Sequence, residues 1–183
     1  MSDEIKKGLL GIVVDETTIS HVVPELSALT YRGYKVQDLC DKCDFEEVAY
    51  LVLHGELPSK TQLKKFSKEE RSSRKLSKTI IKNIQQMPKN AHPMDVIRTC
   101  VSLMALEDKD TKDNSPKANM RKALKIFSQT PTAVAAYFRA RKGKKIITPN
   151  KKLSFSENDN FLLGGIIFFP YLALKYAATA VGV

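Results

Sequence analysis

The chain has 183 residues, of which 43% are hydrophobic and 27% are charged, and its formal net charge at pH 7 is +10. This composition excludes a wholly disordered polymer, and the length suffices for one domain with a core or for part of a larger domain. Lys and Arg are spread along the chain without interleaved aromatic residues or zinc-finger spacing. That distribution favours a solvated basic surface and argues against a nucleic-acid groove.

The first 34 residues favour irregular structure with short extended pieces. LLGIVVDETTIS (9–20) carries a β-branched run, and LTYRGY (29–34) ends in a turn centred on Gly33. The start of the chain lacks the apolar core of a signal peptide and the Arg-rich, acid-poor composition of a transit peptide. A cytoplasmic protein is therefore expected.

Helical signals dominate from Val36 onward, beginning with a short helix over KVQDLCDKC (35–43). Asp44 and Glu47 form a capping-box pattern that opens a helix over 45–57, which Gly55 and Pro58 stop. The next caps are Ser59, before a long polar helix over 60–75, and Ser77, before a helix over 78–87 that Pro88 ends.

The segment KNAHPMDVIRTCVSLMAL (89–106) predicts a further helix with Pro93 at its first position. Its apolar residues recur at spacings of three and four, which predicts a core-facing stripe of Met94, Ile97, Val101 and Met104. A loop over 107–116 follows, then two helices broken at Pro131 and a connecting loop over 144–158. With no internal repeat, the expected class is all-α with a short extended N-terminal segment.

Cys40 and Cys43 form a C-x-x-C pair, and Cys100 is the remaining cysteine. The second pair that a tetrahedral zinc site needs is absent from the sequence, and the pair lies inside a helical pattern rather than between a strand and a helix. Reduced structural thiols are the expectation, with no metal site.

Eight blocks stand in an order and spacing that resemble the citrate synthase family. They are KGLLGIVVDETTIS, LTYRGYKVQDL, CDFEEVAYLVLHGELP, KNAHPMDVIRT, VSLMALED, DNSPKANMRKAL, IFSQTPTAVAAYFRARKGK and ITPNKKLSFSEN. The branch they resemble is the bacterial and archaeal citrate synthase and 2-methylcitrate synthase type, over residues 6 to about 158. The resemblance implies an α-helical homodimer with the active site between a large and a small domain, this chain supplying the N-terminal part of the large domain.

The resemblance also implies condensation of acetyl-CoA or propionyl-CoA with oxaloacetate, followed by thioester hydrolysis. That chemistry needs a carboxylate base, donors for the enol and ketone oxygens, and arginines for the dicarboxylate. The family carries its catalytic aspartate and two histidines on motifs of its later half, and H-E-x-N, H-G-G-A-N and G-H-x-x-Y do not occur in these 183 residues. The chain is therefore assigned no catalytic residue, its substrate-binding and cofactor-binding residues stay unknown, and no permanently bound cofactor is expected.

The three histidines read as structural, because the resemblance places them in the family's structural half. His21 lies in an irregular segment, His54 ends a helix, and His92 stands where it can accept from first-turn amides. Arg32 is expected to anchor the TYRGY turn, and Arg98 to pair with a carboxylate. The basic run RARKGKK (139–145) is read as a solvated helix end rather than a coenzyme A phosphate site.

The apolar tail FLLGGIIFFPYLALKYAATAVGV (161–183) divides the chain into family sequence over 1–158 and a non-family segment over 159–183. Its 23 residues would span about 34 Å as a helix, enough for a bilayer core of about 30 Å. Pro170 and Lys175 argue against insertion. The favoured interpretation is a frameshift, a mis-called gene end or a damaged reading frame near Asn158.

Three functions stay open. The first is a citrate synthase-type acyltransferase of which this chain is the N-terminal part, inactive by itself. The second is a non-catalytic remnant that associates with a full-length subunit, and the third is a C-tail-anchored membrane protein. If helices of a later half normally cover this part, an exposed apolar patch is expected on it.

Overall fold

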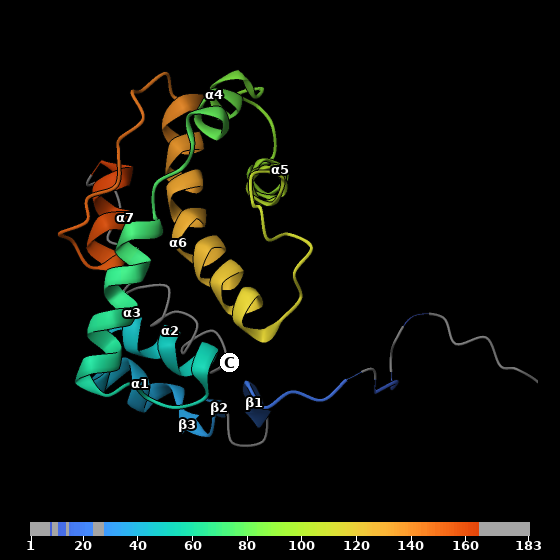
Figure 1. The fold of residues 1–183 in the computed structure, drawn as a ribbon, viewed down its shortest axis with the longest axis vertical. Coiled ribbons are helices and arrows are strands. Elements are labelled where there is room, and N and C mark those ends of the chain that lie inside the picture. The colour runs from blue at the N-terminus through green and yellow to red at the C-terminus, as the bar shows by residue number, and fades with distance from the viewer. Residues whose placement is uncertain (1–7, 9–10, 14, 24–27, 165–183) are drawn as a thin grey trace, which may run out of the picture.

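A computed structural model describes residue 8 and residues 11–13, 15–23 and 28–164. Over these residues the chain is mainly helical, with a small sheet near its N-terminal end (Figure 1). The predicted class, all-α with a short extended N-terminal segment, is confirmed.

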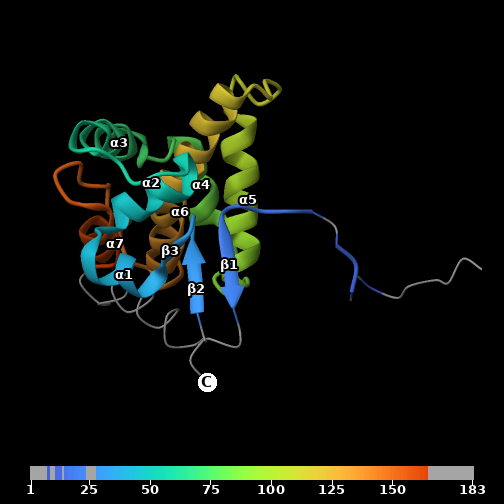
Figure 2. The same ribbon diagram turned by 90° about the horizontal axis from the view of Figure 1, so that it is seen from below.

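The sheet is antiparallel, in the order β1 (Ser20–Val23), β2 (Ala28–Tyr31) and β3 (Tyr34–Lys35). β2 and β3 are joined by Arg32 and Gly33, whose φ angles are 49° and 87°. Two successive positive φ angles suit the right-handed twist of a tight hairpin, and a glycine takes the second without strain. The turn predicted at Gly33 is therefore confirmed, and Figure 2 shows β1 and β2 side by side.

Three predicted helices follow the sheet, and two of them begin directly after the caps predicted at Asp44 and Ser59. They are α1 (Val36–Lys42), α2 (Phe45–His54) and α3 (Lys60–Ser73). The Asp44 N–H donates to Glu47 Oε2 at 2.7 Å, and Gly55 closes α2 with a φ of 93°. Ser59 Oγ accepts from the Gln62 N–H at 3.4 Å at the start of α3. These ends are set by local chemistry.

Helices α4 (Lys78–Gln86) and α5 (Pro93–Leu106) come next. The predicted apolar stripe of α5 is wrong, because the buried face of this helix is rotated away from it. Met94 is 62% exposed, while Val96, Cys100 and Met104 are buried at 3%, 0% and 2%. These three lie four residues apart and pack into the cluster built from α4, α5 and α6. The face that contacts the two neighbouring helices thus runs through Cys100, and Ile97 and Val101 lie half-buried beside it.

Helix α6 (Pro116–Arg141) is continuous, so the predicted break at Pro131 is wrong. A proline inside a helix removes one backbone hydrogen bond and bends the helix, yet packing can hold the two parts together. Here α6 contacts α3, α4, α5 and α7, and Ala133, Ala135 and Ala136 are buried just after the proline. Figure 1 shows α6 as the central, curving helix about which the others gather.

The predicted loop over 144–158 ends early, because α7 (Phe155–Leu163) begins inside it. Ser154 and Glu157 form a capping box, which the pattern S-x-x-E could have revealed. Leu162 and Leu163 pack against Ala135 of α6. Of the apolar tail, only residues 161–164 lie among the described residues, so the predicted nature of the rest falls outside them.

Some large apolar side chains of the described part stay exposed, among them Met94, Leu106, Ile126, Val134 and Phe161. In the same part of the chain, the helices are all too short or too polar to cross a membrane.

Candidate functional site

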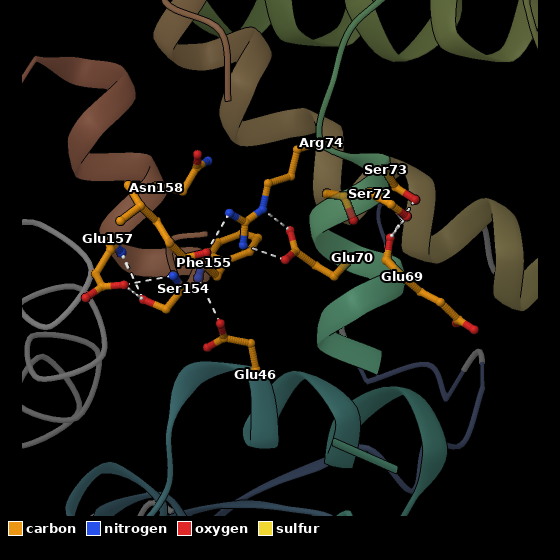
Figure 3. Close-up of polar contacts among 12 residues, drawn as sticks. Glu46, Glu69, Glu70, Ser72, Ser73, Arg74, Ser154, Phe155, Glu157 and Asn158 are labelled. Carbon is orange, nitrogen blue, oxygen red and sulfur yellow. Dashed lines mark hydrogen bonds and ion pairs between the residues drawn. The ribbon is translucent and has the colours of Figure 1, made fainter. Parts of the chain in front are cut away.

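A buried polar junction joins α3 to the segment before α7, and an ion pair forms its centre (Figure 3). Arg74 donates from Nε to Glu70 Oε1 at 2.7 Å and from Nη2 to Glu70 Oε2 at 2.6 Å. The side chains of Arg74 and Glu70 are 1% and 0% exposed. Burial raises the pKa of Glu70, and the hydrogen bonds and charge of Arg74 oppose that rise.

The remaining donors of Arg74 hold the loop that leads to α7. Arg74 Nη1 donates to the backbone carbonyls of Asn150 at 3.2 Å and Leu153 at 3.0 Å. The Arg74 carbonyl in turn accepts from Thr132 Oγ1 at 2.9 Å. The guanidinium is therefore occupied on every side by protein groups, and its chemistry is to fix a loop rather than to bind a substrate.

Two further hydrogen bonds and a ring stack complete the junction. Glu46 Oε1 accepts from the Phe155 N–H at 2.8 Å, across 109 residues of sequence. Asn158 Oδ1 accepts from the Asn150 N–H at 2.8 Å. The Phe155 ring stacks on both Phe45 and Phe127, with centroid distances of 4.6 and 4.7 Å. The start of α7 is thus bound to α2 by a hydrogen bond and a ring stack, and to α6 by a ring stack.

A cavity of about 450 Å³ lies beside this junction. It is bounded by the end of α1, the start of α2, one face of α3 and the start of α7, and Arg71 and Glu46 line it. Cavities of this size can admit a small molecule.

The three histidines stay apart from this cavity and occupy structural positions. His21 is exposed on β1 opposite Thr30. His54 is the last residue of α2 and stacks on Tyr50 at a centroid distance of 4.1 Å. His92 Nδ1 accepts from the Met94 N–H at 3.2 Å, as predicted for a helix N-cap.

The predicted arginines also hold structural positions. Arg32 Nη2 donates to the Val52 carbonyl at 3.0 Å and Nη1 donates to Thr18 Oγ1 at 2.6 Å, so this side chain anchors its turn. Arg98 pairs with Asp95 at 3.0 Å and is 80% exposed. In the 139–145 run, Arg139 donates to the Lys145 carbonyl at 2.6 Å, which ties the end of α6 to the next loop.

The three cysteines form no disulfide with one another. Cys40 and Cys43 lie half-buried at the cavity, and Cys100 is buried in α5. Burial raises the pKa of each thiol, which keeps the sulfur protonated and poorly reactive. Among the described residues, His, Cys, Asp and Glu side chains do not gather in threes that could hold a metal ion.

Sequence reasoning missed the residues of the junction, above all Glu70 and Arg74. Their spacing of four on one helix was a visible signal for an ion pair. Because α3 is polar on most of its surface, that signal looked like an ordinary solvated pair.

Comparison with known proteins connects this fold to one family. The sequence model described as "Citrate synthase, C-terminal domain" matches residues 8–166. A citrate synthase of Mycolicibacterium smegmatis is 47% identical over 84% of this chain and 41% of its own length. A 2-methylcitrate synthase of Mycobacterium tuberculosis H37Rv is 46% identical over 85% of this chain and 39% of its own length.

The solved structures agree. A citrate synthase from Pyrobaculum aerophilum superposes with a TM-score of 0.83 at 25% identity, over 94% of this chain and 45% of the other. One from Thermotoga maritima gives 0.78 at 30% identity, over 97% of this chain and 46% of the other. The chain thus spans about two fifths of the length of the curated relatives it matches, and it belongs to the citrate synthase family.

Proposed function

We propose that this chain is the N-terminal portion of an acyltransferase that condenses acetyl-CoA or propionyl-CoA with oxaloacetate. The observation that supports it is the extent of the match, which runs through almost every described helix at 46–47% identity to a citrate synthase and a 2-methylcitrate synthase. In such an enzyme the residues described above form a scaffold, and the acyl-CoA is a co-substrate rather than a resident cofactor. A cytoplasmic homodimer is part of the same proposal.

The chain by itself is expected to be inactive. Its three histidines occupy a strand, a helix end and an N-cap, and Arg74 is engaged by protein groups. An enolising base and two polarising donors must converge on one reacting centre. The described residues do not offer that convergence.

A thiol-release assay with oxaloacetate and either acetyl-CoA or propionyl-CoA tests this expectation. The 2-methylcitrate synthase of Mycobacterium tuberculosis serves as the positive control in the same buffer. We expect no thiol release above the enzyme-free rate. Turnover of about one per second, a rate typical of real enzymes, would overturn the proposal of an inactive portion.

Two alternatives are separated by other measurements. A remnant that associates with a full-length subunit would co-elute with a tagged full-length relative in size-exclusion chromatography. A membrane-anchored protein would resist carbonate extraction and need detergent. The boundary between family sequence and tail stays a prediction near residue 158, although the family match continues to 166 and α7 to Leu163.

A further inference from the structure

We draw no further inference here: the strongest candidate, the apolar surface patch around the cavity of about 220 Å³ that Ile97 of α5 and Val134 of α6 line, carries none because nothing in the described part of the chain shows what covers it.

Discussion

Arg74 and Glu70 lie one helical turn apart and share two hydrogen bonds of 2.6 and 2.7 Å in a site closed to water. Each charge depends on the other, since the side chains are 1% and 0% exposed. A buried pair of this kind stabilises little by comparison with apolar residues, but it is costly to break from one side. The pair therefore has a clear signature in mutagenesis.

Glu70→Leu or Arg74→Met should each lower the free energy of unfolding by about 3–5 kcal/mol, because one buried charge loses its partner. The double variant Glu70→Leu/Arg74→Met should lose less than the sum of the two, with a coupling of about 2–3 kcal/mol. Urea unfolding of the four proteins measures this cycle. Asp38→Asn, which breaks the exposed pair with Lys42, is the control and should cost less than about 1 kcal/mol. Additive losses at Glu70 and Arg74 would contradict the buried pair.

Tyr137→Phe should destabilise the chain by about 1–2 kcal/mol. The Tyr137 hydroxyl lies 2.9 Å from the Pro88 carbonyl and 3.0 Å from the Ala91 carbonyl, so it joins α6 to the turn between α4 and α5. Tyr34→Phe on β3, where the side chain is 43% exposed, is the matched control and should change stability by less than about 0.5 kcal/mol. Equal urea midpoints for the two variants would count against the hydroxyl contact.

Thr132→Val should cost about 1–3 kcal/mol, because the buried Arg74 carbonyl loses its donor while the side-chain shape is kept. Thr132→Ser keeps the hydroxyl and should recover most of the loss. Thermal unfolding followed by circular dichroism compares them. If serine and valine were equally destabilising, packing rather than the hydrogen bond would explain the position.

The pH dependence of stability should involve Glu157. The backbone N–H and the hydroxyl of Ser154 donate to its carboxylate and hold its pKa below the ordinary value. A lowered pKa in the folded state gives stability that is present above the unfolded pKa and is lost as the pH falls through the folded pKa. The urea midpoint of the wild type should therefore decrease as the pH is lowered from about 5 to about 3.

Glu157→Gln can still accept at the cap but has no charge to titrate. Its urea midpoint should fall less over the same pH range, while the contributions of Asp108 and Asp113, whose pKa values are also lowered by hydrogen bonds, remain. An equal fall for both proteins would contradict the assigned role of Glu157.

Helix ends could be predicted from the sequence because their causes are local. Ser59, Ser77 and the Asp44–Glu47 pair act on amides within three residues, and the structure places the caps there. The helix break predicted at Pro131 is wrong because the local effect of the proline, a lost hydrogen bond, is outweighed by packing of α6 against its neighbours. The core-facing stripe predicted on α5 is wrong because Cys100 was not counted as a core residue.

The polar junction was beyond sequence reasoning for a different reason. Arg74 is one of many basic residues, and its carbonyl partners at Asn150 and Leu153 lie 76 and 79 residues away. Every residue has a backbone carbonyl, so the sequence does not show which carbonyls will accept from Arg74. The prediction of structural histidines rests on local features, since His54 ends α2 and His92 caps α5, whereas His21 lies on β1.

The contact between Glu46 and the Phe155 N–H has a consequence for synthesis on the ribosome. The two residues are 109 positions apart. At about 5–20 residues per second, Glu46 emerges roughly 5–20 s before its partner exists. Over that interval the carbonyl partners of Arg74 are also missing, so α2 and α3 cannot complete their native contacts. The early helices therefore complete their native packing only when the last described helix is made.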